Sequence, residues 1–311
     1  MATLKEIRSR ISSVKNIRKI TRAMEMVAAA RLRRAEQRIE ALRPYADALR
    51  RMTRRASEAA ESIPSLPILQ EREQISNVGL LLVTGDRGLA GPFNSQIMRA
   101  GSRRASEIES DGAQTLWYAS GRRGVSSLEF RGREVAGAFT GFTDRPTFAD
   151  ARKIADAVTS AYVDEKVDRV ELIYNGYISP MRQEVRHETL LPLQHADVLG
   201  EEEEEESSDN NRQSSGEKAE AADQSRSLWI YEPDPEEILA RLVPDYVEIS
   251  IYRALLESTA SEHGARMTAM RSASDNAGEL LDDLELEANR QRQAEITQEI
   301  MEVVAGAEGL R

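Results

Sequence analysis

The sequence predicts an α+α/β protein, in which a long coiled coil of the N- and C-terminal helices carries an inserted Rossmann-like α/β domain. Three observations predict this fold. Both ends of the chain show apolar residues at helical spacing over several ordinary helix lengths. The middle alternates strand-like and helix-like segments, which is typical of a mostly parallel sheet. The two ends also carry opposite net charge, which favours pairing them with each other.

The first predicted element is a helix over about residues 3–62, a stretch without glycine. A helix may contain one proline at a bend, and we expect that bend at Pro44. At about 1.5 Å per residue the helix would be roughly 80–90 Å long. Its apolar residues recur in steps of three and four, and the run of threes predicts a local change of supercoil. These residues are Leu4, Ile7, Ile11, Val14, Ile17, Ile20, Met24 and Val27.

The last predicted element is a second long helix, based on the proline-free stretch from Tyr246 to Val304. Neither helix could be covered along its length by an ordinary globular domain, so each needs a partner helix. The apolar stripe of this second helix comprises Ile249, Tyr252, Leu256, Met267, Met270, Ala277, Leu281, Leu284, Ala288, Ile296, Ile300 and Val303.

Charge supports the pairing of the two ends. Residues 1–60 hold about sixteen basic and six acidic side chains, whereas residues 246–311 hold about six basic and thirteen acidic ones. Individual exposed ion pairs stabilise a protein little. We therefore expect charge to set the choice of partner and the apolar seam to supply the stability.

The middle of the chain predicts an α/β domain whose strands are joined by right-handed crossovers. We place the N-terminal coiled-coil helix at residues 1–62, this domain at 76–231 and the C-terminal coiled-coil helix at 234–311. The expected strands are 77–84, 114–120, 134–140, 168–175 and 183–193, with 227–231 closing the sheet, and the expected helices are 93–109, 121–130 and 147–164.

A glycine-rich turn at residues 85–91 follows the first expected strand and opens a helix. That placement suits a phosphate cradle. Its spacing is not GxGxxG, however, and the lysine of a P-loop is missing, so a tight strand-to-helix turn is the better interpretation. No catalytic set follows from spacing, and we expect no catalytic, cofactor-binding or metal site of the chain's own.

Composition narrows the function further. The chain has no cysteine, and its histidines, His187, His195 and His263, do not stand at metal-ligand spacing. The net charge of −11 comes mostly from one insert, for which residues 200–225 predict an acidic, solvated and disordered loop. No apolar run approaches the roughly 20 residues that span a bilayer. We expect a cytoplasmic protein, unless partners hold it at a membrane.

Three long motifs stand in order along the chain. They are KITRAMEMVAAARLRRA at 19–35, TGDRGLAGPFNSQI at 84–97 and ARMTAMRSASDNAGELLDDLELEANRQRQAEITQEIMEVVAGAE at 265–308. They resemble the N-terminal signature, the glycine-turn motif (usually DRGLCGGFN) and the C-terminal signature of F-type ATP synthase gamma subunits. With YEPDP at 231–235, the resemblance covers essentially the whole chain. Ala90 and Pro92 depart from the usual Cys and Gly, and the missing cysteines rule out a chloroplast-type thiol switch.

The resemblance implies an antiparallel coiled coil that turns inside a ring of three alpha and three beta subunits, with one copy per complex. The α/β domain would lie below, against the epsilon subunit and the membrane c-ring. Flow of H⁺ or Na⁺ would turn the c-ring and the shaft, and the asymmetric shaft would bias the three nucleotide sites differently. The implied location is the cytoplasmic face of the bacterial plasma membrane, as a peripheral protein.

The motif match also implies where the shaft meets its partners. The expected partner contacts are Met24, Arg266, Arg292, Gln293, Thr297 and Glu302. The alternative for each is an ordinary coiled-coil or solvated helix residue. The basic N-terminal helix suits acidic loops on the beta subunits.

Two other functions were weighed. An enzyme with a nucleotide site in the α/β domain would need the P-loop lysine and catalytic set that are missing. A nucleic-acid-binding coiled coil would use the basic N-terminal helix and bind DNA in a salt-dependent way. That helix offers only Tyr45 for base stacking, and an acidic partner helix would cancel its field. We therefore expect no nucleic-acid partner.

Overall fold

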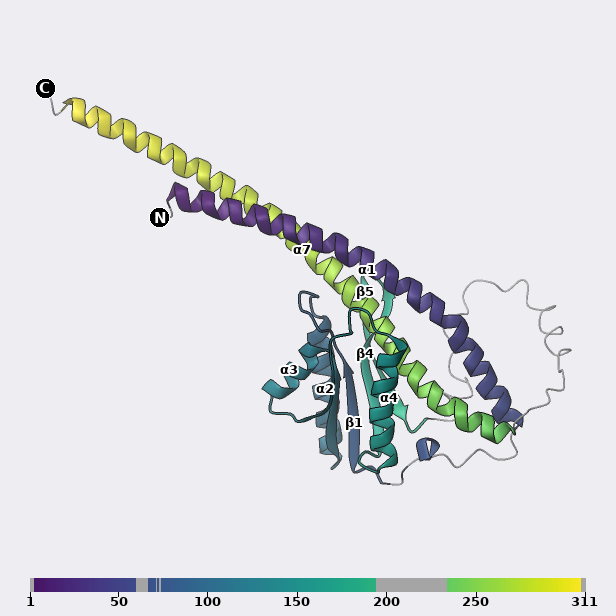
Figure 1. The fold of residues 1–311 in the computed structure, drawn as a ribbon. Coiled ribbons are helices and arrows are strands. Elements are labelled where there is room, and N and C mark those ends of the chain that lie inside the picture. Colours follow the sequence, from purple (N-terminus) through teal and green to yellow (C-terminus); the bar gives the residue numbers. More distant parts are fainter. Residues whose placement is uncertain (1–2, 60–66, 71, 73, 194–233, 309–311) are drawn as a thin grey trace, which may run out of the picture.

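The computed structural model describes residues 3–59, 67–70, 72, 74–193 and 234–308. The expected acidic loop at 200–225, the expected strand at 227–231 and His195 lie outside these ranges. The described chain consists of a long helical shaft with a compact α/β base attached along one side (Figure 1).

The shaft is an antiparallel pair of helices, α1 (Leu4–Ala59) and α7 (Pro235–Glu308). The N-terminal part of α1 and the C-terminal part of α7 lie toward the same end of the shaft (Figure 1), and contacts such as Lys15–Glu285 (2.9 Å) and Glu25–Arg271 (2.9 Å) fix the register. At about 1.5 Å per residue, α1 is roughly 84 Å long and α7 roughly 111 Å. The predicted coiled coil of the two ends is confirmed.

The seam of the coiled coil differs from the predicted stripe. Ile7, Ala28, Leu32 and Ala35 are buried, and they fit one series of alternating four- and three-residue steps. In the middle of α1 that series falls on polar residues, and Arg18 there lies across Gly278 of α7.

Consequently, part of the predicted apolar stripe is wrong. Ile17, Ile20 and Val27 are 52%, 58% and 53% exposed, because each stands one position away from the series that faces α7. The run of three-residue steps therefore marks a point where apolar residues leave the seam and turn outward.

The helices pass through their prolines. α1 includes Pro44, and in Figure 1 its C-terminal half, which contains this proline, runs at an angle to its N-terminal half. α7 begins at Pro235 and includes Pro244, so it starts before the proline-free stretch that predicted it. A proline is tolerated at the first position of a helix, where its missing N–H leaves no bond unmade.

The base contains a five-stranded sheet in the order β3-β2-β1-β4-β5. Strands β1 to β4 are parallel to one another, whereas β5 is antiparallel to β4. The sheet is therefore largely parallel, as predicted. The strands are β1 (Asn77–Val83), β2 (Gln114–Ser120), β3 (Val135–Phe139), β4 (Arg169–Ser179) and β5 (Arg182–Leu191). The helices are α2 (Phe93–Ser110), α3 (Arg122–Phe130) and α4 (Phe148–Val163), with a short 3₁₀ turn η1 (Pro67–Leu69).

Helices cover both faces of the sheet. Alternate residues of β1 enter two different cores, with Leu80 and Leu82 against α2 and α3, and Leu81 and Val83 against α4. The second core also takes in α7 through Val243, Val247, Ile251, Ala254 and Leu255. One helix thus belongs both to the base and to the shaft.

Candidate functional site

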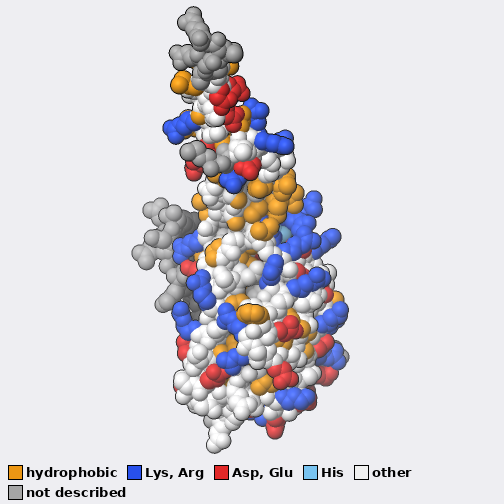
Figure 2. Space-filling model, turned by 90° about the vertical axis from the view of Figure 1, so that its left-hand side faces the viewer, with side chains coloured by type: hydrophobic (Ala, Val, Ile, Leu, Met, Phe, Trp, Pro, Cys, Tyr) orange, Lys and Arg blue, Asp and Glu red, His pale blue; other side chains and the backbone are white. Residues whose placement is uncertain are grey.

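The shaft carries apolar side chains that neither helix of the chain covers. On α1, Ile17, Ile20, Met26 and Val27 are all more than half exposed, and on α7 Leu280 and Leu286 are about half exposed. Figure 2 shows such side chains gathered on the coiled coil, with basic residues beside them. Exposed apolar groups on this scale mark surfaces that bind another protein.

Among the described residues, no other helix lies beside the tip of α7. Lys15 of α1 pairs with Glu285 of α7. Counted from this pair towards the tip, α1 reaches its N-terminus before α7 reaches its C-terminus, and Figure 1 shows α7 extending beyond α1. Ile296, Ile300, Met301, Val303 and Val304 in this part are 48–72% exposed. A single amphipathic helix of this kind needs an external apolar surface.

The structure spreads the predicted contact residues along the shaft. Met24 is half-buried on α1, whereas Arg292, Gln293, Thr297 and Glu302 are all exposed near the tip of α7. There Thr297 Oγ1 donates to the Gln293 carbonyl (2.9 Å), and Glu302 accepts a hydrogen bond from Gln298 (3.0 Å). The four tip residues are therefore accessible to a partner.

Arg266 differs from the other five because it is only 8% exposed and its bonds are internal. It forms an ion pair with Glu262, donates to the Gly88 carbonyl (3.2 Å) and lies 3.3 Å from His263 Nδ1. Arg266 thus holds α7 against the glycine-rich turn of the base. Sequence spacing could have signalled this pair, since Glu262 and Arg266 are four residues apart on one helix.

The glycine-rich turn at residues 85–91 packs against Glu262 and Arg266 of α7, and we call this contact the joint between shaft and base. A Cβ at Gly85 would lie 2.8 Å from the carboxyl carbon of Glu262, so a side chain there would displace the Glu262 carboxylate from its present position. The turn leaves β1 where the strand order reverses between β1 and β4, the point at which open α/β sheets usually bind ligands. Here Glu262 and Arg266 fill that point.

Asp86 ties three loops of the base together beside this joint. Its carboxylate accepts hydrogen bonds from the backbone N–H groups of Arg122 (3.0 Å), Gly141 (2.9 Å) and Thr143 (3.2 Å). Burial acts to raise the pKa of Asp86, but these hydrogen bonds outweigh it and hold the pKa below its usual value. The loops that follow β1, β2 and β3 are thus held as one unit.

His263 is buried in the same joint and is expected to make the chain acid-sensitive. Burial, followed by the nearby Arg266, lowers its pKa to about 4. In the unfolded chain this histidine has its ordinary pKa of 6.5, so stability falls as pH drops from about 6.5 towards 4. Between pH 7 and 5 the loss is about 2 kcal/mol.

Urea unfolding at pH 7 and pH 5 checks this expectation. His263→Asn should remove most of the loss in that window, since asparagine does not titrate but still offers an oxygen to Arg266. Equal losses in the parent and the variant would show that another group controls the acid sensitivity.

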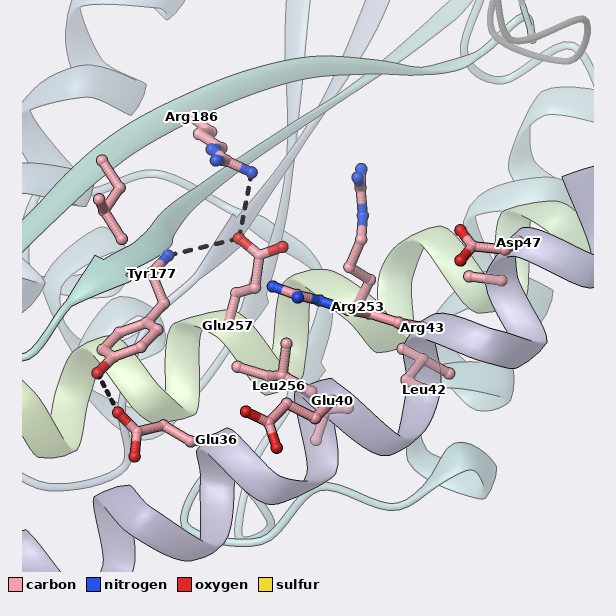
Figure 3. A pocket seen from close by; sticks show the side chains of 13 residues that line it. Glu36, Glu40, Leu42, Arg43, Asp47, Tyr177, Arg186, Arg253, Leu256 and Glu257 are labelled. Atoms are coloured by element: carbon pink, nitrogen blue, oxygen red, sulfur yellow. Dashed lines mark hydrogen bonds and ion pairs between the residues drawn. The ribbon is translucent and has the colours of Figure 1, made fainter. Parts of the chain in front are cut away.

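A groove of about 480 Å³ opens between α1, α7 and the β4–β5 hairpin (Figure 3). Two pairs of lining side chains are bonded to each other. Arg186 donates to Glu257 across 3.3 Å, and the Tyr177 hydroxyl donates to Glu36 of α1. Burial raises the pKa of Glu257, although Arg186 and Arg253 act against it. These bonds brace the shaft against the hairpin.

Among the residues that the structure describes, no group of three or more His, Cys, Asp or Glu side chains could hold a metal ion. Within the same ranges, no helix is both long and apolar enough to cross a membrane.

A long exposed coiled coil on an α/β base, with an uncovered apolar surface and a projecting tip, defines a stalk subunit of a larger assembly. Comparison with known proteins identifies its family. A family model described as ATP synthase matches residues 3–310. The ATP synthase gamma chain of Rubrobacter xylanophilus is 40% identical, over 100% of this chain and 99% of its own length. That of Nostoc punctiforme is 43% identical over the full length of both.

Solved structures agree. A chain of the central stalk and c-ring structure of Tetrahymena thermophila mitochondrial ATP synthase is 26% identical, with a TM-score of 0.58 over 82% of this chain and 99% of that one. A chain of the Euglena gracilis mitochondrial enzyme shares the fold, with a TM-score of 0.65 and 16% identity over 99% of this chain and 94% of its own length. The chain therefore belongs to the ATP synthase gamma chain family.

Proposed function

We propose that this chain is the central rotor shaft of an F-type ATP synthase. Flow of H⁺ or Na⁺ through the c-ring turns the shaft, and the turning shaft changes the conformations of the beta subunits that make or hydrolyse ATP. The main support for the proposal is that the shaft exposes apolar side chains and a projecting helix tip, which the described part of the chain does not bury. A ring of three alpha and three beta subunits would enclose that surface.

The shaft is asymmetric in a way that suits rotation. Its tip is a single helix, and its apolar surface comes from unequal parts of α1 and α7. Each beta subunit would therefore meet a different face at any moment. A shaft that contacts one conformation of a beta subunit better than another shifts its equilibrium, and rotation passes that bias from site to site.

The proposal gives the chain no catalytic site of its own. The ligand-binding point of the sheet is filled by Glu262 and Arg266, and in the groove Arg186 is paired with Glu257. Catalysis would belong to the beta subunits. We place the chain at the cytoplasmic face of a bacterial plasma membrane, held there by the epsilon subunit and the c-ring below its base.

We propose direct ring contacts for Arg292, Gln293, Thr297 and Glu302, which are exposed on the tip, and for the half-buried Met24. For Arg266 the structure favours a role at the joint, so a ring contact through it would have to use its small exposed fraction. We also propose the domain limits given above, with the addition that residues 243–255 of α7 pack into the base.

Reconstitution tests the proposal. Purified alpha and beta subunits are mixed with and without this chain, and the ATPase rate and subunit ratio are measured. We expect active complexes with one copy of the chain per three alpha–beta pairs. If the chain neither joins the ring nor changes its ATPase rate, the proposed function is wrong.

Arg292→Ala is expected to lower the ATPase rate of that complex about three- to tenfold, because it removes an exposed charge at the ring contact. Arg290→Ala is the matched control, since this exposed arginine faces another side of the same helix. Equal effects of the two substitutions would contradict a specific contact at Arg292.

A further inference from the structure

The joint between shaft and base has two separate attachments along α7. The first is apolar, where residues such as Val243, Val247 and Ile251 pack into the core of the base. The second is polar and lies further along the helix towards its C-terminus, at residues 259–266. Between them the helix passes from one side of the sheet to the carboxyl ends of its strands, where the loops of the base meet the shaft.

The polar attachment reaches separate parts of the base. Thr259 Oγ1 donates to the Thr143 carbonyl (2.9 Å), and Ser261 Oγ donates to the Asn175 carbonyl (3.1 Å). Glu262, paired with Arg266, sits against the glycine-rich turn. These contacts are directional, whereas apolar packing is not.

Helix α1 joins the same attachment from the other side. Arg31 Nη1 donates to the Asp144 carboxylate at 2.8 Å, and Arg87 of the glycine-rich turn approaches the same carboxylate at 3.5 Å. Both helices of the shaft are thus bonded to loops that Asp86 holds as one unit. A turn of the shaft about its axis pulls directly on these loops.

The Glu262–Arg266 pair is the charged part of this attachment on α7, and it is buried, with side chains 2% and 9% exposed. Two residues facing solvent could hold such a pair only loosely, but here the surrounding loops fix both side chains. Breaking a buried pair by removing one partner leaves an uncompensated charge and is costly. The pair itself lies within α7, and it reaches the base through the hydrogen bond from Arg266 to the Gly88 carbonyl (3.2 Å) and the packing of Glu262 on Gly85. Moving α7 away from the turn would therefore break these contacts and uncover the pair.

We propose that Glu262 and Arg266 form a latch that fixes the angle of the base on the shaft and so transmits torque between them. This inference rests on the proposed function. With the latch closed, turning of the base turns the tip by the same angle. With the latch open, the base would be held mainly by the apolar attachment, and it would swing on α7 so that part of the rotation is lost.

The test uses the complete ATP synthase complex in sealed membrane vesicles, with ATPase rate and ATP-driven ion pumping measured together. Glu262→Gln removes the charge of the latch with little change in shape. Gly85→Ala keeps both charges but places a methyl group within 2.8 Å of the Glu262 carboxylate. We expect either variant to keep its ATPase rate within about twofold and to lose pumping per ATP at least threefold.

Arg271→Gln is the matched control, because it breaks an exposed pair with Glu25 on the next turns of the same helix. It should leave both readouts unchanged. A latch with a merely structural role would lower the yield of complex, while the complexes that form would pump normally, and that result overturns the inference. If the parent chain itself gave no coupled complex, the proposed function would fail instead.

Discussion

Gly121→Ala is expected to destabilise the base by about 3–5 kcal/mol. Gly121 precedes α3 with φ +94°, a conformation that side chains rarely adopt, and its added Cβ would lie 2.2 Å from the Thr84 carbonyl oxygen. Neither side can move to make room. Gly121 N–H donates to the Phe139 carbonyl (2.7 Å), while Thr84 N–H donates to the Ser120 carbonyl (2.8 Å). Denaturant unfolding of the full chain measures the loss.

Gly132→Ala separates the two causes of that loss. Gly132 also has a positive φ of +70°, but an added Cβ would meet nothing within 4 Å. We expect this control to cost about 1–2 kcal/mol, which is the backbone strain alone. If both substitutions cost the same, the close approach of Gly121 to Thr84 does not constrain the base.

Glu171→Gln is expected to cost about 3 kcal/mol at pH 7. Glu171 lies near the start of β4 and its side chain is 1% exposed, between Arg104 of α2 (2.8 Å to each carboxylate oxygen) and His187 of β5 (2.7 Å). Burial alone would raise its pKa, but the hydrogen bonds from Arg104 and His187 outweigh it and hold the pKa at about 2.

The sign of the pH dependence follows from that lowered pKa. The contribution of Glu171 to stability is fully present above its ordinary pKa of 4.5, and it is lost as pH falls from there through about 2. The parent chain should therefore lose stability in this window and the variant should lose less. The window lies below the main loss expected for His263, so a stability curve from pH 7 to 2.5 resolves the two.

Glu184→Gln is the matched control for Glu171. Glu184 lies on β5 and pairs with Arg182 through side chains that are 53% and 70% exposed. We expect less than about 0.5 kcal/mol from its loss. If Glu184→Gln lowered stability as much as Glu171→Gln, the loss would come from the charge of the β4–β5 hairpin and not from the buried pairing of Glu171.

The pattern of the sequence predicted the secondary structure of the base well, most clearly for β1 and β2, which are short and mostly apolar. Strand β2, at Gln114–Ser120, has the expected limits. The pattern failed where tertiary contacts overrule local signals. Pro244 would ordinarily break a helix, yet α7 continues through it, because Val243 and Val247 on either side are buried in the core.

The functional surface was harder to predict than the fold. Ile17 and Ile20 fit a helix face and were therefore assigned to the seam, although that face is turned away from α7. Periodicity shows that residues share a face but not which partner covers it. The joint was missed for a related reason. Glu262 and His263 are polar residues in a buried position, and only the packing of α7 on the base shows that they are enclosed.

Rotation of the base relative to an immobilised alpha–beta ring tests the central claim most directly. The chain has no cysteine, so Glu129→Cys on the exposed side of α3 gives a single attachment point for a bead. With ATP, the account predicts that the bead turns in one direction, in steps that repeat three times per revolution. A bead that stays in place or only fluctuates, while the ring hydrolyses ATP at the normal rate, would contradict the claim that this chain is the rotor.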